Sequence, residues 1–359
     1  MKALVLNDTR NGKHLGCILV MQQLESLCHE VGIEISAMLR LGLDFRARAA
    51  VEISRCDVVI INGEGTMHHD AAAAKAIMEA ALIAADLGRP VALINTVWQG
   101  NKQTNLLLSK CNWISVRESL SRESIEQAGY AAKVVPDLLL SSRTERLFLK
   151  TNTHAGVIVM DDVRWELSLA LARYASVRHL PFYPMGARPS LSTRKGWEMY
   201  LKLGWASNWA SQFHMGQVSA VRDASLVLTG RFHGICLAIL SQRPFVAFAS
   251  NTHKIEGLLK DAGLGGGGLL FDDPPSDPAQ CHSYIDQAIA TVMDHMALGD
   301  NRHAYEKACA EFSARARSDA ISMFEDIRAL RSFSDKAQIK FTTTIYSREA
   351  LQKSSQRLT

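Results

Sequence analysis

The sequence predicts an α/β protein with two Rossmann-like domains that face each other across a cleft. Short apolar runs alternate with helical patterns over residues 1–140, and the same alternation starts again at residue 156. A polar stretch, residues 141–153, separates the two series and is interpreted as a linker. Strands and helices that alternate with short connections form right-handed βαβ units and an open parallel sheet, so each series predicts one sheet. The length of 359 residues also suits two domains.

The first series defines an N-terminal domain over residues 1–145. The β-branched run DVVIIN, residues 57–62, has the composition of a strand buried on both faces of a parallel sheet. An Ala-rich helix, residues 71–87, follows it and ends at stop signals, a glycine and a proline. The other strands are expected at 2–7, 33–38, 91–96, 113–116 and 133–135, and the other helices at 16–31 and 119–128.

The second series defines a C-terminal domain over residues 150–332 that ends in two long helices. Strands are expected at 156–160, 179–183, 226–229, 245–249 and 269–271, and helices at 165–176, 234–241, 253–262, 282–296 and 301–332. Residues 335–359 are polar with little periodicity and are interpreted as a tail. Ligands of doubly wound sheets bind outside the carboxyl ends of the strands, so polar residues directly after each strand are the candidates for a functional site.

The composition is that of an ordinary globular protein, with 47% hydrophobic and 21% charged residues. The net charge of +4 is not gathered in a basic stripe, which argues against a nucleic-acid partner and suits a small anionic substrate. Seven cysteines without CxxC spacing predict reduced thiols rather than a disulfide framework or a zinc site. No apolar run is long enough for a membrane span or a signal peptide. These features predict a cytoplasmic protein.

The segment Ile61–Asp70 (INGEGTMHHD) directly follows the buried strand 57–62. Gly63 and Gly65 allow a tight turn with backbone N–H groups exposed at a helix start, an arrangement that binds anions. A plain glycine turn with surface histidines at 68 and 69 is an equal interpretation. The HHD sequence is not interpreted as a metal site, because adjacent residues diverge on a helix. Neither GxGxxG nor a P-loop is present.

A second candidate segment is Ser115–Ser124 (SVRESLSRES), in which Arg117 emerges at the end of a predicted strand. A guanidinium in that place can bind a phosphate or a carboxylate through a bidentate pair of hydrogen bonds. The alternative is a structural role, in which Arg117 pairs with Glu118 or Glu123.

A third segment, Thr229–Lys254, carries Arg231, His233 and Lys254 at the ends of two neighbouring predicted strands. Basic side chains at a helix N-terminus are unfavourable against the helix dipole. Three basic side chains at the ends of adjacent strands therefore favour an anion-binding role over a structural one.

The loop Asn7–Cys17 (NDTRNGKHLGC) follows the first predicted strand. A polar loop in this place commonly lines the cleft of a doubly wound protein. Asn7, Asp8 and His14 are candidates for holding hydroxyl groups, and a solvated connection is the alternative.

Taken together, these segments resemble the polysaccharide pyruvyl transferase family. The resemblance covers residues 1–265, and its most specific part is the R-x-H-G block that begins at Arg231. Its other elements are the loop 7–16, the turn 62–65, the run Ser115–Ser121 and Pro136-Asp137. The chain departs from the family pattern in two places. Its glycine triplet is interrupted by Glu64, and its N-terminal loop carries Asn11-Gly12 and His14 in place of a Gly-Asp pair.

The resemblance implies a GT-B-type architecture and transfer of the pyruvyl group of phosphoenolpyruvate onto two sugar hydroxyls, which gives a cyclic ketal. The residues that it implies for donor binding are Arg117, Arg231, His233, Lys254, Gly63 and Gly65. Those implied for catalysis are His233, His68, Arg231 and Arg117. Those expected to face the acceptor are Asn7, Asp8, His14 and Glu64. Neither a metal nor an organic cofactor is expected, since phosphoenolpyruvate acts as a co-substrate.

The acceptor that the resemblance implies is a saccharide, free or lipid-linked, of a cell-surface polysaccharide such as an exopolysaccharide. Such an acceptor would bring the enzyme into peripheral contact with the inner face of the membrane. Two other functions stay open: a GT-B glycosyltransferase that uses a nucleotide-activated sugar, and a non-catalytic sugar-binding relative. The three cations of residues 231–254 argue against the last, because an idle site has no reason to hold them. The sequence predicts no oligomeric state.

Overall fold

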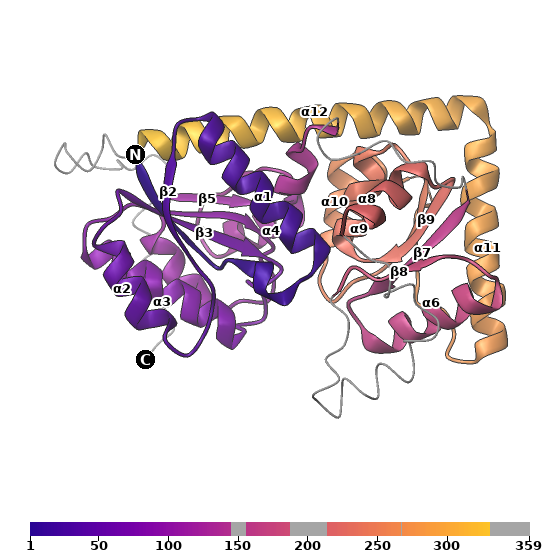
Figure 1. The fold of residues 1–359 in the computed structure, drawn as a ribbon, viewed down its shortest axis with the longest axis horizontal. Coiled ribbons are helices and arrows are strands. Elements are labelled where there is room, and N and C mark those ends of the chain that lie inside the picture. The colour runs from indigo at the N-terminus through magenta and orange to yellow at the C-terminus, as the bar shows by residue number, and fades with distance from the viewer. Residues whose placement is uncertain (145–155, 187–213, 267, 331–359) are drawn as a thin grey trace.

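Two parallel sheets, one in each half of the chain, form the framework of the protein (Figure 1). The computed structural model describes residues 1–144, 156–186, 214–266 and 268–330. Every strand pair in both sheets is parallel, and helices cover the faces of each sheet. The predicted class, two Rossmann-like α/β domains, is therefore confirmed.

The first sheet has the strand order β2-β1-β3-β4-β5-β6. Its strands are β1 (Lys2–Leu6), β2 (Glu34–Leu39), β3 (Val58–Glu64), β4 (Val91–Thr96), β5 (Trp113–Val116) and β6 (Lys133–Val134). All residues of β3 and β4 are buried, as expected for central strands covered on both faces. The strand β3 extends two residues beyond the predicted run, so Gly63 and Glu64 belong to the strand.

The second sheet has the order β11-β10-β9-β7-β8. Its strands are β7 (Val157–Asp162), β8 (Phe182–Tyr183), β9 (Leu226–Gly230), β10 (Phe245–Phe248) and β11 (Leu270–Phe271). The central strand β9 pairs with β7 and β10 and is entirely buried. Its carboxyl end leads directly into the R-x-H-G block.

The helices follow the strands in the expected alternation. They are α1 (Leu15–Glu30), α2 (Phe45–Ile53), α3 (Ala72–Asp86), α4 (Ser119–Gln127), α6 (Trp165–Val177), α8 (His214–Asp223), α9 (Phe232–Leu240), α10 (Lys254–Asp261), α11 (Pro278–Ala297) and α12 (Gly299–Ala329), with 3-10 turns η1 (Thr9–Gly12), η2 (Thr104–Lys110) and η3 (Leu138–Ser141). The sequence does not predict the helices α2 and α8 or the three turns. The helix α9 begins two residues before its predicted start, at Phe232, so His233 lies inside the helix.

The apolar helix α9 is buried at every position and sits between the two domains. A helix that is apolar on all sides needs partners on all sides. Its partners are β9 and α8 in its own domain, η3 of the N-terminal domain and the long helix α12. One hydrophobic core therefore runs from the α1 side of the first sheet through η3 and α9 into the second domain.

The 31-residue helix α12 crosses both domains (Figure 1). It packs against α9 and α11 on the C-terminal side and against η3 and α1 on the N-terminal side. Arg317 Nη2 donates to both carboxylate oxygens of Glu30 at 2.7 and 2.8 Å, and Arg328 Nη1 donates to the carbonyl oxygen of Val31 at 2.8 Å. The predicted terminal helix thus joins the two domains.

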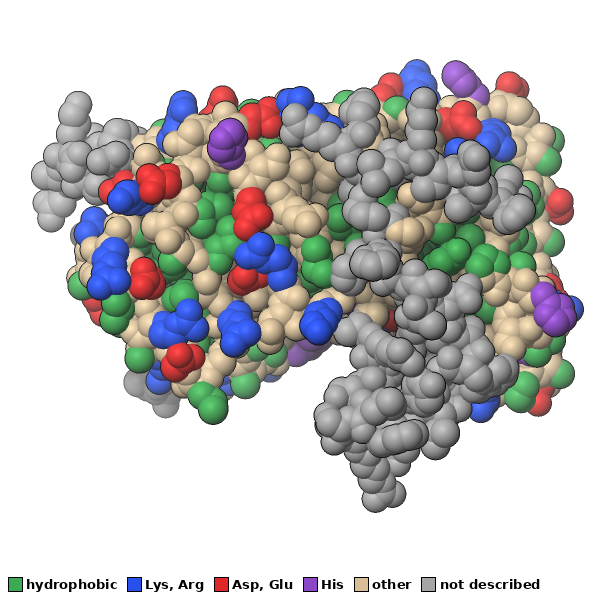
Figure 2. Space-filling view, viewed as in Figure 1, with side chains coloured by type: hydrophobic (Ala, Val, Ile, Leu, Met, Phe, Trp, Pro, Cys, Tyr) green, Lys and Arg blue, Asp and Glu red, His purple; other side chains and the backbone are tan. Residues whose placement is uncertain are grey.

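Two predicted segments lie wholly or mostly outside the described residues: the tail 335–359 and the linker 141–153, of which residues 141–144 are described. Across the described part of the chain, none of the helices is both long and apolar enough to cross a bilayer. On the face in Figure 2, the described Lys and Arg side chains are interspersed with acidic ones and form no continuous basic stripe.

Candidate functional site

The candidate site lies where loops after the strands of the first sheet contact loops after the strands of the second. Leu15 N, beyond β1, donates to Met185 O, beyond β8, at 2.8 Å. His253 N, beyond β10, donates to Gln99 Oε1, beyond β4, at 3.0 Å. The carboxyl ends of both sheets therefore meet at one interface, in agreement with the expectation that the candidate residues follow strands.

His233 in the first turn of α9 is seated against the N-terminal domain. A Cβ on Gly16 would lie 2.2 Å from Nδ1 of His233, so the ring uses space that only a glycine leaves free. Its Nε2 lies 3.6 Å from Oδ2 of Asp137. The centre of its ring is 5.9 Å from that of His14, the residue before α1. The structure thus brings His233 and His14 together from opposite domains.

Arg117, directly after β5, is enclosed at the same interface. Its side chain is 1% exposed, Nη1 donates to Asp137 Oδ2 at 3.0 Å, and the guanidinium carbon lies 4.4 Å from the centre of the Phe232 ring. Its partner is thus Asp137 rather than Glu118 or Glu123. A guanidinium enclosed in this way has little surface left for a ligand in this conformation.

Asp137 is a fully buried carboxylate with partners in both domains. Its Oδ1 accepts from Leu139 N at 2.9 Å and so caps η3. Burial raises its pKa, but the combined effect of His233, Arg117 and the Leu139 amide is larger and holds that pKa below the usual value. The carboxylate is therefore charged at neutral pH.

Lys254, the first residue of α10, is a buried amine at the same interface. Its Nζ donates to Asn251 Oδ1 at 2.9 Å. Burial and the charges of Arg117 and Arg231 lower the pKa of Lys254 to about 7. An anion bound beside Nζ would favour the ammonium form, so this position gains from a negatively charged ligand.

Arg231 caps the N-terminal end of α9 without a side-chain bond to that helix. Its Nη2 donates to Asp161 Oδ2 at 2.5 Å, and Asp161 Oδ1 accepts from Met185 N at 2.9 Å. The Nε of Arg231 is buried and has no hydrogen-bond partner among the described residues. Arg231 and His233 therefore contact different partners, and one buried guanidinium nitrogen is left for a ligand.

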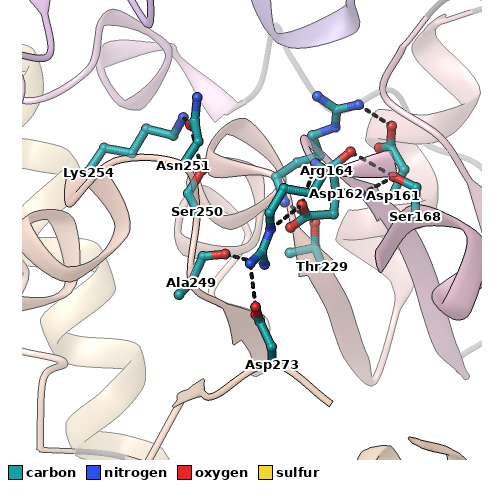
Figure 3. Close-up of polar contacts among 11 residues, drawn as sticks. Asp161, Asp162, Arg164, Ser168, Thr229, Ala249, Ser250, Asn251, Lys254 and Asp273 are labelled. Carbon is teal, nitrogen blue, oxygen red and sulfur yellow. Dashed lines mark hydrogen bonds and ion pairs between the residues drawn. The ribbon is translucent and has the colours of Figure 1, made fainter. Parts of the chain in front are cut away.

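Figure 3 shows a polar network at the carboxyl edge of the second sheet, around Asp162 and Arg164. Arg164 donates to Asp162 Oδ1 from its N and Nε at 2.6 and 3.1 Å, to Ala249 O at 2.6 Å and to Asp273 Oδ2 at 2.5 Å. A Cβ on Gly230 would overlap Asp162 Oδ2 at 1.7 Å. This network fixes the ends of β7, β9 and β10 relative to one another.

His68 lies in the turn between β3 and α3, where it forms a parallel bridge with Gln99. Its Nδ1 is 2.9 Å from Nδ1 of His69. Burial, then the charges of His69 and Lys254, lower the pKa of His68. Since Gln99 also accepts from His253 N, it connects the turn of His68 to the start of α10, where Lys254 lies.

The residues predicted to hold an acceptor in the first loop have partners within the protein. Asn7 Nδ2 donates to Asn62 O at 2.7 Å. Asp8 accepts from Nε and Nη2 of Arg10 at 2.9 and 2.8 Å, and this pairing is the side-on arrangement that holds a carboxylate most firmly. In this conformation these two side chains shape the loop, and His14 is the member of the set that lies beside His233.

Glu64, at the end of β3, is also held by neighbours. Its Oε1 accepts from Thr9 Oγ1 at 2.7 Å and its Oε2 from Cys17 Sγ at 3.1 Å. Its positive φ of 40° bends the chain at the carboxyl edge of the sheet. The glutamate that interrupts the glycine triplet therefore links the first loop to the start of α1.

The two glycines of the predicted anion-binding turn have different environments. A Cβ on Gly63 would lie 2.4 Å from the side chain of Thr96 in the neighbouring strand β4, so this glycine permits close packing inside the sheet. Gly65 is exposed, and a Cβ added there would meet no heavy atom of the described residues within 4 Å. Of the two, only Gly65 presents its backbone at the surface.

A second interdomain contact, not predicted from the sequence, joins α4 to α10. Glu118 is fully buried, caps α4 through Ser121 N at 2.9 Å, and lies 3.5 Å from Nε2 of His253. A Cβ on Gly257 would be 2.3 Å from Oε2 of Glu118. Ser119 N also donates to Asp261 Oδ2 at 2.7 Å. These contacts fix α10, and Lys254 with it, against the N-terminal domain.

Some of the site residues that the sequence did not predict could have been found in it. Asp161 and Asp162 end the apolar strand β7, but a search for basic residues at an anion site passes over the acids that orient those bases. Gln99 and Glu118 make contacts across the interface between the domains, and a single sequence without an alignment gives no sign of such contacts. In the described ranges, no group of three or more His, Cys, Asp or Glu side chains is arranged to hold a metal ion.

The family model described as polysaccharide pyruvyl transferase matches residues 12–203, more than half of the chain. The chain belongs to the polysaccharide pyruvyl transferase family. The match includes the turn of Gly63 and the run of Arg117, whereas the block from Arg231 to Lys254 lies beyond it. No curated protein matches the sequence significantly.

Solved structures with the same architecture confirm the GT-B-type arrangement of this pyruvyl transferase family member. The S. aureus MnaA–UDP co-structure aligns with a TM-score of 0.57 at 10% identity, over 96% of this chain and 100% of that chain. A putative UDP-N-acetylglucosamine 2-epimerase from Listeria monocytogenes aligns with a TM-score of 0.55 at 12% identity, over 94% and 97%. At such identities the likeness concerns the fold.

Proposed function

We propose that the protein transfers the pyruvyl group of phosphoenolpyruvate to two hydroxyls of a saccharide acceptor and forms a cyclic ketal. Membership of the family supports pyruvyl transfer in general. The observation that carries the choice of donor is the gathering of Arg231, Lys254 and the N-terminus of α9 at one interface. Phosphoenolpyruvate carries a phosphate and a carboxylate, and cations together with helix N–H groups are the groups that bind both.

In this proposal Arg231 and Lys254 hold the donor. The buried Nε of Arg231 has no partner among the described residues and would receive one from the donor. The ammonium form of Lys254 is favoured once the donor dianion lies beside it. As the phosphate leaves, its charge grows, and preorganised cations at its oxygens stabilise the transition state.

The reaction requires two proton transfers, and we assign them to His233 and His68. One hydroxyl proton of the acceptor is matched by the proton that converts the donor methylene into a methyl group, and the other leaves with phosphate. His233 takes part in protonation of the methylene carbon, since histidine exchanges protons near neutral pH. His68, whose pKa is lowered by burial and by the charges of His69 and Lys254, exchanges the proton that leaves with phosphate. His14, beside His233, faces the acceptor.

The test is a screen for product rather than for binding. The protein is incubated with phosphoenolpyruvate and p-nitrophenyl glycosides of the common hexoses, and mass spectrometry follows gain of one pyruvyl ketal together with phosphate release. A ketal formed by the wild type and lost in His233→Ala supports the proposal. Transfer of a sugar from UDP-N-acetylglucosamine to the same acceptors, without ketal formation, would replace it by the nucleotide-sugar function. The Neisseria meningitidis UDP-GlcNAc 2-epimerase, solved with UDP-GlcNAc, aligns with a TM-score of 0.50 at 12% identity over 92% of this chain and 100% of that chain, and motivates this arm.

A further inference from the structure

We propose that Asp137 is a positioning residue for His233 and that it acts across the domain interface together with Arg117. The inference rests on the proposed function, because it concerns the histidine that the proposal places at the donor. It concerns residues that touch His233 rather than the donor. The two residues lie after β5 and β6 of the N-terminal domain, whereas His233 belongs to α9 of the C-terminal domain.

The burial of Asp137 is the first argument. A carboxylate without solvent exposure is costly unless it is paired and hydrogen-bonded. Arg117 at 3.0 Å and the amide of Leu139 at 2.9 Å already satisfy two positions of Asp137. The approach of His233 Nε2 to 3.6 Å from the same Oδ2 is a third, longer contact of a carboxylate that already accepts two hydrogen bonds.

The geometry around the imidazole is the second argument. Nε2 of His233 faces Asp137, and the Nδ1 edge of the ring lies over Gly16. A carboxylate that faces one ring nitrogen fixes the orientation of the imidazole and selects the nitrogen that carries the hydrogen. This leaves Nδ1 as the nitrogen with the lone pair, on the side of the ring that packs over Gly16.

Arg117 completes the arrangement because it contacts two of the neighbours of the imidazole, Asp137 and Phe232. It donates to Asp137 and lies under the ring of Phe232, the residue before His233. One guanidinium therefore orients the carboxylate and supports the first turn of α9. If Arg117 only joined the domains, neither its contact with Asp137 nor its contact with Phe232 would need to lie beside His233.

The test uses Asp137→Asn, which retains the shape and the cap of η3 but removes the charge. The control is Asp277→Asn, because Asp277 also caps a helix, accepting from Gln280 N at 2.9 Å at the start of α11, away from the interface. Both proteins are labelled with nitrogen-15 histidine, and the ring correlations of His233 are assigned by their loss in His233→Gln. The two-bond proton–nitrogen pattern then reports which ring nitrogen carries the hydrogen.

At alkaline pH, we expect His233 of the wild type to carry its hydrogen on Nε2. Asp137→Asn should show a mixture of tautomers, and Asp277→Asn should match the wild type. Calorimetry with phosphoenolpyruvate should give an affinity within about threefold of the wild type for Asp137→Asn, since the residue does not hold the donor.

An unchanged tautomer pattern in Asp137→Asn overturns the inference, and so does a loss of donor affinity greater than about tenfold, roughly 1.4 kcal/mol. If Asp137→Asn does not fold, Asp137→Asn combined with Arg117→Gln removes both charges and allows the same measurement. Failure of phosphoenolpyruvate to bind the wild type would contradict the proposed function instead. The tautomer pattern would still decide the role of Asp137.

Discussion

Gly16 of the N-terminal domain lies against the imidazole of His233 in the C-terminal domain, so closely that a Cβ at position 16 would be 2.2 Å from Nδ1. The two residues are far apart in the sequence and meet only because the domains pack together. Alongside them, Leu15 N donates to Met185 O. The start of α1 therefore packs against the imidazole of His233 and also forms a hydrogen bond between the two domains.

This contact predicts the effect of Gly16→Ala. Alanine is the better helix former by about 1 kcal/mol, so α1 itself would gain from the change. Overpacking against His233 should outweigh that gain and destabilise the protein by about 1–3 kcal/mol in urea unfolding. Gly12→Ala is the control, because no atom of the described residues lies within 4 Å of a Cβ at that position. Equal stability of both variants would show that the ring moves away without cost.

The pair of Arg117 and Asp137 predicts a large loss of stability when one charge is removed. Arg117→Met leaves Asp137 buried without its main partner and should lower the free energy of unfolding by about 3–5 kcal/mol. Arg178→Met is the matched control, because Arg178 pairs with Asp286 on the exposed surface, where a pair contributes about 0–1 kcal/mol. Similar losses in the two variants would contradict the burial of the first pair.

The environment of Lys254 predicts how donor binding depends on pH. With a pKa of about 7, its amine is charged below that pH and becomes neutral above it. An anionic donor should therefore bind less tightly as the pH rises. Lys254→Arg keeps its charge throughout, so the ratio of the two dissociation constants cancels the titration of the donor. Between about pH 6 and 8.5 the wild type should lose about tenfold in affinity relative to the variant. Parallel profiles would show that the charge of Lys254 does not contribute.

The contact of α10 with Glu118 predicts an effect of a substitution one helical turn from Lys254. Gly257→Ala should force α10 away from Glu118 and move Lys254, because the added Cβ would be 2.3 Å from Oε2. Donor affinity should fall by about tenfold, equivalent to about 1.4 kcal/mol. Gly216→Ala in α8 has open space around it among the described residues and should instead leave binding unchanged. The affinity of both variants for phosphoenolpyruvate is measured by calorimetry. An unchanged affinity in Gly257→Ala would mean that the contact with Glu118 does not hold α10 in place.

Much of the fold can be predicted from sequence because each element carries its own signal. The run DVVIIN has the composition of a buried parallel strand, and the alternation of strands and helices determines the class. The predicted start of α9 is two residues late because its first turn contains the polar His233 and Gly234, which resemble the end of a loop in the sequence. The helix α2 is not predicted, although its buried residues Phe45, Ala49 and Ile53 recur every four residues, because it is only nine residues long and charged residues interrupt it.

The candidate site can be predicted only as separate residues. Arg231, His233 and Lys254 are found because they follow strands, and strand ends converge by topology. Their partners cannot be found in this way. Arg117 and Asp137 are 20 residues apart and belong to neighbouring strand ends, and Gly16 and His233 come from different domains. Contacts between parts of the chain far apart in sequence leave no periodicity to detect.

The central claim is that the cations at the interface bind phosphoenolpyruvate. Titration of phosphoenolpyruvate into the wild type and into Arg231→Gln by calorimetry tests it most directly, with UDP and UDP-N-acetylglucosamine as competing ligands. The account predicts binding to the wild type that falls by at least tenfold in Arg231→Gln, or about 1.4 kcal/mol, and no comparable binding of either nucleotide. Binding of a nucleotide but not of phosphoenolpyruvate would contradict it.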